Sequence, residues 1–271
     1  MKLRLMIFLI ITLNLTFSQT TKNEINALKK YNSYILKSYH TDQNWSIKYI
    51  LNKGLIQEEQ NYRDNEFRSV KKNSYDKRSN IIYKVLIFEN KFNDQKMDTL
   101  SEEFLKYDDK NRLIELRHVT KFSVTKLTDD DTILEVYSDF DKNSNAKIID
   151  RYKGDYEPIY YSYSKENREF DSKGNLIREE KIAFRDTQKK EPSEILKSET
   201  IIYQYDKYSN VIELKRNFEP KIEMPYTGLD GLTIYEVENY EYEYNDKGLW
   251  LKKYLVVEGK KKLLEERTFN K

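Results

Sequence analysis

The sequence predicts a mainly β fold: a meandering antiparallel sheet of hairpin repeats, curled into an open half-barrel or spiral, with one N-terminal capping helix. The first observation is a short turn-like frame that recurs six times along the chain. The second is that the residues flanking these frames alternate between apolar and polar, as strands with one buried face do. The third is an aromatic-rich composition, with 23 Tyr and 12 Phe beside only 7 Gly and 4 Pro, since aromatic side chains favour strands.

The six frames share an aromatic residue, Asp or Asn, two polar residues, and Gly, Asn or Ser, usually followed by Asn and an aliphatic pair. They cover 75–82, 107–114, 140–147, 170–177, 205–212 and 244–251, and begin 30 to 39 residues apart. Gly174 and Gly248 suit a left-handed turn position, and Asn111 tolerates it next best. In the other copies either Ser or the following Asn takes it: Ser79 or Asn80, Ser144 or Asn145, Ser209 or Asn210. Each frame predicts a hairpin, and neighbouring hairpins bury one another's aromatic faces.

The frame FDSKGNLI at 170–177 resembles the YD repeat of Rhs-type bacterial exported and surface proteins. That resemblance implies β-hairpin units, which in the family form long arrays that curl into a shell and are sometimes described as carbohydrate-binding. This chain departs from the family pattern in its longer period, its frequent replacement of Gly and its small number of copies. The resemblance covers most of residues 70–255 and implies an exported hairpin-repeat protein.

The first 18 residues have the pattern of a secretory signal peptide. Lys2 and Arg4 precede a short apolar run, and the small residue Ser18 precedes a polar start. The apolar run is shorter than the ~20 residues that a membrane-spanning helix needs, which disfavours an uncleaved anchor. We therefore expect an exported protein in the periplasm or on the surface of a Gram-negative bacterium, with no integral membrane span after cleavage.

The mature chain is expected to form one domain over residues 19–271. Ile25, Leu28, Tyr31, Ile35 and Tyr39 follow a helical period, which predicts an amphipathic helix over about 22–39. Residues 40–72 are expected to hold a degenerate first hairpin, with a strand at 45–51 and a turn at 52–54. The repeats then run over about 70–255.

The charge balance and the residue types exclude several kinds of function. Removing residues 1–18 leaves 46 basic residues against 46 acidic ones, and a neutral chain lacks the net basicity typical of nucleic-acid binders and of proteins that bind anionic membranes. With no Cys, disulfides and thiol catalysis are impossible. His40 and His118 have no companion at ligand spacing, and Asp129–Asp131 lacks the spacing of a calcium loop. We expect no catalytic residue, no cofactor and no metal.

These observations predict a non-catalytic binding or structural module whose ligand is a glycan or a surface protein. Aromatic rings that project outward would contact the ligand, and the candidates are Trp250, Tyr226 and Tyr161. One alternative is a glycan hydrolase that uses a carboxylate pair. Another is an outer-membrane barrel, although a barrel in lipid needs a continuous apolar band and 35% of the residues are charged.

Overall fold

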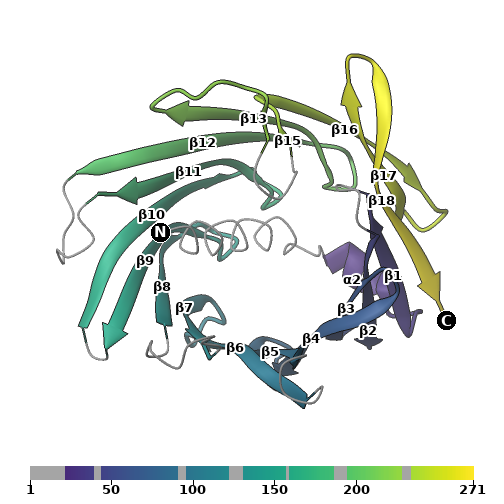
Figure 1. Cartoon of the computed structure of the whole chain (residues 1–271), viewed down its shortest axis with the longest axis horizontal. Helices are drawn as coiled ribbons and strands as arrows, with labels where there is room; N and C mark the ends of the chain where they lie inside the picture. The colour runs from purple at the N-terminus through teal and green to yellow at the C-terminus, as the bar shows by residue number, and fades with distance from the viewer. Residues whose placement is uncertain are drawn as a thin grey trace.

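The structure, a computed structural model, is a closed barrel of sixteen antiparallel strands (Figure 1). It describes residues 22–39, 44–90, 96–121, 131–156, 159–185, 194–227 and 233–271, so the expected signal peptide lies outside the described residues. Among those residues, no helix is long and apolar enough to cross a membrane.

The described elements are one short helix and eighteen strands. In chain order they are α2 (Lys22–Leu28), β1 (Ser33–Ser38), β2 (Trp45–Asn52), β3 (Leu55–Arg63), β4 (Glu66–Tyr75), β5 (Ile81–Asn90), β6 (Lys96–Tyr107), β7 (Leu113–Thr120), β8 (Asp131–Phe140), β9 (Ala146–Tyr156), β10 (Ile159–Phe170), β11 (Leu176–Phe184), β12 (Ile195–Tyr205), β13 (Val211–Glu219), β14 (Tyr226–Thr227), β15 (Thr233–Ile234), β16 (Val237–Tyr244), β17 (Trp250–Val257) and β18 (Lys260–Asn270).

Each strand of the barrel pairs with its neighbours along the chain, with two exceptions. The small hairpin of β14 and β15 forms a sheet of its own, so β13 pairs directly with β16. At the closure, β1 pairs with β2 on one side and with β18 on the other. Ser33 lies opposite Ile50 in one ladder and opposite Asn270 in the other.

The expected open half-barrel or spiral is therefore wrong, and the reason lies in the first strand. The helix expected over 22–39 ends at Leu28, and residues 33–38 form β1 instead. Apolar residues at a helical period can also alternate along a strand, and here Tyr34 and Leu36 are buried while Ile35 lies between them on the other face. Pairing with the adjacent β2 and the distant β18 outweighs the local helical preference, because each ladder satisfies backbone hydrogen bonds.

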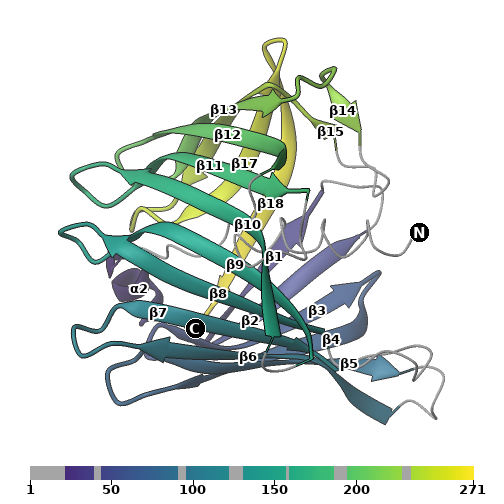
Figure 2. The same ribbon diagram turned by 90° about the vertical axis from the view of Figure 1, so that its left-hand side faces the viewer.

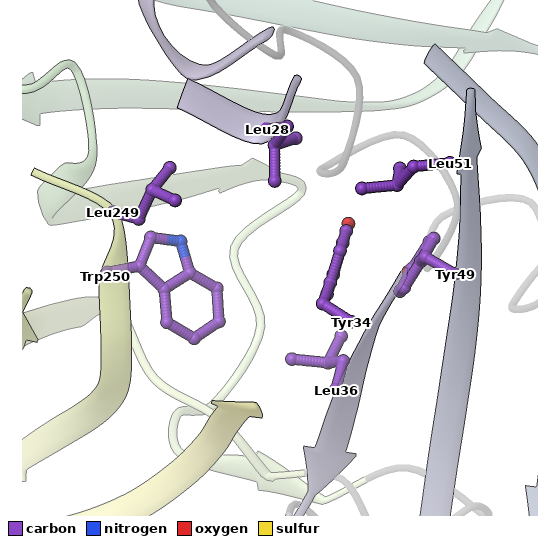
Figure 3. Close-up of a cluster of buried hydrophobic side chains, with 7 residues drawn as sticks. All are labelled: Leu28, Tyr34, Leu36, Tyr49, Leu51, Leu249 and Trp250. Carbon is purple, nitrogen blue, oxygen red and sulfur yellow. The ribbon is translucent and has the colours of Figure 1, made fainter. Parts of the chain in front are cut away.

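Helix α2 identifies which face of the wall points inward. Figure 1 shows α2 inside the ring of strands, and Figure 2 shows it at one end of the barrel. Leu28 is 1% exposed and packs in a cluster of buried side chains drawn in Figure 3. The members are Leu28, Tyr34, Leu36, Tyr49, Leu51, Leu249 and Trp250. The strand residues of this cluster therefore face inward, and alternation along each strand assigns the two faces of the remaining wall.

The six frames form the predicted turns, and the fourth turn position is left-handed in every copy. Its φ angles lie between 64° and 87°. The residues are Ser79, Asn111, Ser144, Gly174, Ser209 and Gly248. Where the sequence left Ser and Asn as alternatives, Ser takes the left-handed position, because the Asn side chain has another partner. The amide of Asn80, for example, donates to Asp76 Oδ2 at 2.9 Å. The degenerate hairpin with its turn at 52–54 is also confirmed.

The aromatic residue that opens each frame lies at a break in the strand register. In five hairpins the register shifts at this residue: Tyr75, Tyr107, Phe170, Tyr205 and Tyr244. Such bulges bend a strand and increase its twist. Repeating one per hairpin gives the wall the regular curvature that closure requires.

Tyrosine hydroxyls bond successive hairpins to one another. Tyr107 donates to the carbonyl of Ile81 at 3.1 Å, and Tyr205 donates to the carbonyl of Leu176 at 2.6 Å. Each bond joins the end of one hairpin to the start of the second strand of the hairpin before it. Tyrosine rather than phenylalanine in the frame therefore supplies a polar contact between repeats as well as apolar burial.

Gly248 tests the turn geometry. Its φ is 73°, and a Cβ there would lie 2.8 Å from Cε1 of Tyr208, so we expect Gly248→Val to destabilise the protein by about 1–3 kcal/mol. The urea midpoint measures this. Ser209→Gly relieves the same backbone strain (φ 67°) in the preceding turn and should leave stability unchanged or raise it. A midpoint that falls equally in both variants would contradict the assigned turn.

Candidate functional site

The inner wall from β8 to β16 contains a band of buried charged side chains, and this band is the candidate site. On β10, β12 and β16, every second position counted back from the inward aromatic residue of the frame faces the interior, whereas on β8 the left-handed Asp139 interrupts this alternation and Glu135 faces inward. On these strands many such positions hold Arg, Lys or Glu rather than aliphatic residues. Those that are less than 9% exposed are Glu135, Arg151, Glu166, Glu179 and Glu238.

Glu166 on β10 lies at the centre of the first part of the band. It is fully buried and accepts from Arg151 Nη2 of β9 at 2.8 Å and from Arg168 Nε of its own strand. Arg151 also donates through Nε to Glu135 Oε1 of β8 at 2.7 Å. Two carboxylates and two guanidinium groups thus alternate across three strands, so that no buried charge in the group lacks an opposite partner.

This arrangement keeps the carboxyl group of Glu166 ionised. Burial alone would raise the pKa of its carboxyl, but the guanidinium groups of Arg168 and Arg151 outweigh that effect and lower the pKa to about 2. The neighbouring phenol of Tyr137 donates to Glu135, and its pKa is raised by burial and by that carboxylate. Tyr137 therefore stays a neutral donor.

A second group lies on β12, β13 and β16. Arg216 contacts Glu238 Oε1 through Nη1 at 2.5 Å and Glu199 Oε1 through Nε at 3.5 Å. The hydroxyl of Tyr240 donates to Glu238. Burial raises the pKa of Glu199, since its contact with Arg216 is the longer of the two. Between the two groups, Lys181 Nζ lies 2.9 Å from Glu179 Oε1, to which Tyr203 also donates.

A third group involves His118, which has no companion at ligand spacing in the sequence. On the inner wall its Nδ1 lies 3.6 Å from Glu103 Oε1, and Glu103 also pairs with Lys84 at 2.8 Å. Burial acts to raise the pKa of Glu103, but the contacts from His118 and Lys84 lower it well below the usual range. Glu103 is therefore the shared anion of this group.

The three groups give the inner wall a polar but charge-compensated lining. Carboxylates and cations alternate, and hydroxyls of Tyr137, Tyr203 and Tyr240 supply further donors. Within the described ranges no cluster of His, Asp or Glu has the arrangement of a metal site. The opposite partners offset part of the free-energy cost of removing these charges from water, and the charge-assisted hydrogen bonds join neighbouring strands.

Trp250 is the sequence-predicted ligand residue that the structure places most clearly. Its expected exposure is wrong: the ring is 7% exposed, lies in the α2 cluster and has the guanidinium of Arg267 3.7 Å from its centroid. The register shift between Glu243 and Tyr244 sets Trp250 directly opposite Tyr244. It therefore shares the inward face of Tyr244, whereas simple alternation from the apolar residues around it suggested the outer face.

Tyr226 lies apart from Trp250, outside the barrel sheet. Tyr226 lies on β14 and is 48% exposed. Tyr161 lies on β10, but its side chain falls outside the described part of the structure, as do His40, Asp129 and Asp130. A ligand role for Tyr226 or Tyr161 stays a prediction.

Sequence reasoning missed Glu166, Arg151 and Arg216 because charged residues within strands were assigned to solvent. A signal was present. Phe170 opens a frame and faces inward, and counting back by two places Arg168 and Glu166 on the same face. The alternation in the sequence therefore identified the inner face, but it did not show that this face is partly ionic.

Comparisons with known proteins show likeness in three-dimensional structure alone. No protein-family model and no curated protein matches the chain, so membership of the YD-repeat family stays a prediction. Among solved structures, the chain is similar to a porin-like protein from Bacteroides uniformis ATCC 8492, at 10% identity and a TM-score of 0.49, covering 89% of this chain and 98% of that one.

Two toxin structures show weaker likeness. A TcdB2-TccC3-TEV chain has 9% identity and a TM-score of 0.35, with coverage of 77% of this chain and 10% of that chain. The Photorhabdus luminescens Tc holotoxin pore has 12% identity and a TM-score of 0.29, with coverage of 82% and 11%. All three TM-scores lie below 0.5, and the function proposed below rests on this chain's own residues.

Glu166→Gln tests the buried ionic group. The substitution keeps the shape but leaves Arg151 and Arg168 without their shared anion, so we expect a loss of about 3–5 kcal/mol in the free energy of unfolding. The matched control is Glu169→Gln on the same strand, which removes an exposed pair with Arg178 and should cost about 1 kcal/mol or less. Urea denaturation of both variants gives the comparison, and equal losses would contradict the ionic group.

The same carboxyl predicts a pH dependence. The pKa of Glu166 is about 2 in the folded protein, against 4.5 for an ordinary glutamate. Its contribution is therefore complete above pH 4.5 and is lost as the pH falls toward 2. Between these values the melting temperature of the unaltered protein should fall more steeply than that of Glu166→Gln. Parallel curves would show that Glu166 is not the titrating group.

Trp250→Ala should destabilise the protein by about 3–5 kcal/mol, because it leaves a cavity beneath α2 and removes the ring that Arg267 covers. The exposed Tyr226→Ala serves as the control and should change stability by about 0.5 kcal/mol or less. Thermal unfolding followed by circular dichroism measures both. A Trp250→Ala variant of unchanged stability would return this ring to the set of exposed ligand contacts.

Proposed function

We propose that the protein is an exported β-barrel that works in water, in the periplasm or on the cell surface, as a non-catalytic binding or structural module. The observation that carries the proposal is the charged outer wall. Tyr240 and Tyr242 face inward. Successive strand residues point to opposite faces, so Glu241 and Glu243 face outward. Glu241 pairs with Lys261 at 2.5 Å, and Glu243 lies 3.7 Å from Lys252.

Outward charges occur on well-separated parts of the barrel. On β3 and β4, Glu58 lies 3.7 Å from Lys72, which is about half exposed. On β10 and β11, Arg178 contacts Glu169 at 2.8 Å. Apolar residues such as Phe104 and Ile202 are exposed among them, but the charged positions interrupt a continuous apolar band.

A wall of this kind suits water better than lipid. Moving one outward Arg or Lys to the middle of a bilayer costs about 2–4 kcal/mol, and the outer wall carries several on different strands. In water the same residues form solvated ion pairs of small net effect. Export itself rests on the signal-peptide pattern of residues 1–18.

The second candidate is an outer-membrane barrel, and closure is the observation that favours it. A closed barrel leaves no strand edge unpaired, which is the requirement that lipid places on a β protein. A polar inner wall is also typical of such barrels. The closed sheet therefore supports the outer-membrane barrel, which an open sheet would have disfavoured. The outer charges favour the aqueous barrel.

The β14–β15 hairpin offers the clearest contact surface for a ligand of the module. Tyr226 is exposed there, and an exposed ring on a short hairpin can stack on a sugar ring or on an apolar surface of a protein. A glycan or a surface protein is the ligand class that this residue supports.

Fractionation distinguishes the two candidates. The full chain is produced in a Gram-negative host, and the envelope is separated into periplasm and membranes, which are washed with alkaline carbonate. We expect the protein in the periplasm or the carbonate wash, and the form that begins at Gln19 should fold in buffer without detergent. A carbonate-resistant protein that folds only in detergent or lipid would establish the outer-membrane barrel instead.

A further inference from the structure

One end of the barrel is lined by basic residues at the tips of its tight turns. Because the strands are antiparallel, the turns at 52–54, 76–80, 108–112, 141–145, 171–175, 206–210 and 245–249 all lie at the same end. Figure 2 shows several of them projecting together beside α2. Each has an exposed lysine at its tip. The set, called the basic crown here, is Lys53, Lys77, Arg78, Lys110, Lys142, Lys173, Lys207 and Lys247.

The acidic residues of the same turns are directed away from the tips. Asp76 is half-buried, and its Oδ1 accepts from the backbone N–H groups of Arg78 at 2.8 Å and Asn80 at 2.9 Å. The Asp residues of the other frames bond in the same way. Among the described turn residues only Asp109 and Asp246 present an exposed carboxylate, against eight exposed cations of the crown.

The crown is also available to a partner. No residue of the crown forms an ion pair with a carboxylate anywhere in the described ranges. Lys207 and Lys247 instead lie about 5 Å from the rings of Tyr208 and Tyr31, contacts that leave the positive charge in place. Lys29 and Lys30 at the end of α2 are exposed beside the first turn and add to the same end.

Among the residues that the structure describes at the opposite end, cations and carboxylates are mixed. There, exposed cations such as Lys221 and Lys260 stand among exposed carboxylates that include Glu219, Glu223 and Glu258. The neutral charge of the whole mature chain therefore conceals an uneven distribution along the barrel axis.

We propose that the basic crown docks the barrel end-on against a membrane surface rich in anionic lipid headgroups. A ring of tips at one end can meet a flat surface at many points at once, whereas an extended polymer would reach only part of the ring. Each lysine near an anionic lipid surface strengthens binding by about fivefold. The attraction acts within a Debye length of about 10 Å at 0.1 M salt, so docking is peripheral and reversible by salt.

The test uses residues 19–271 and sedimentation with phosphatidylglycerol–phosphatidylcholine vesicles. We expect binding at low salt, release at high salt and no binding to phosphatidylcholine alone. The variant Lys142→Gln, Lys173→Gln, Lys207→Gln should bind roughly a hundredfold more weakly. The control variant Lys221→Gln, Lys260→Gln, Lys262→Gln removes the same charge from the opposite end and should bind as the unaltered protein does.

Equal losses in both variants would show general electrostatic attraction and overturn the crown as a docking surface. Absence of vesicle binding at low salt, or binding that ignores lipid charge, would overturn it too. Crown-dependent binding to a soluble acidic polysaccharide but not to vesicles would assign the crown to a different partner. Failure of vesicle binding would overturn the crown as a docking surface and leave the aqueous barrel untouched. Carbonate-resistant insertion would overturn the aqueous barrel, and it is distinguished from docking because salt does not release it.

Discussion

The pairing of β1 with both β18 and β2 is the interaction on which the rest of the structure depends. Six residue pairs join β1 to each neighbour. Without this strand, β2 and β18 would be two exposed edges, each a row of unsatisfied backbone groups. Helix α2 supports the strand from inside, because Leu28 lies in one buried cluster with Tyr34 and Leu36 while Glu24 accepts a hydrogen bond from Arg267 of β18. Closure therefore combines backbone pairing with a small core at one end.

Closure also determines where charge can lie. Once the wall is continuous, every inward position is confined with its neighbours, and buried groups such as Arg151 and Glu166 must satisfy one another. Outward positions are not confined in this way, and they carry loosely paired charges such as Glu243 and Lys252. At the turns, the carboxylate of the frame's Asp accepts hydrogen bonds from backbone N–H groups, while the cationic side chains that follow it are exposed. The inner wall, outer wall and crown thus use the same residue types under three different constraints.

The local parts of this fold could be predicted from the sequence, and the long-range parts could not. Turn geometry at Gly174 and Gly248 depends on residues close in the chain, so the hairpins were predictable. Residues 33–38 form a strand because they pair with β18, which lies more than 200 residues away in the chain. Their helical period predicted a helix instead. Trp250 was misassigned because one register shift reverses the parity of the strand residues beyond it. The buried ionic groups depend on which strands become neighbours, and the charge of the crown appears only when distant turns are brought to one end.

The pairing of the first and last strands makes the order of hairpins in space circular, although the chain that encodes it is linear. Ser33 and Asn270 face each other across a ladder like that of any adjacent pair. The ladder between the first and last strands therefore does not differ from the ladders between strands that are consecutive in the chain. A rearranged gene that joined these two ends and opened a return connection elsewhere would encode the same cyclic order of strands. Duplication of a hairpin, by contrast, would have to widen the whole ring, so closure constrains the number of hairpins more strongly than the position at which the chain begins.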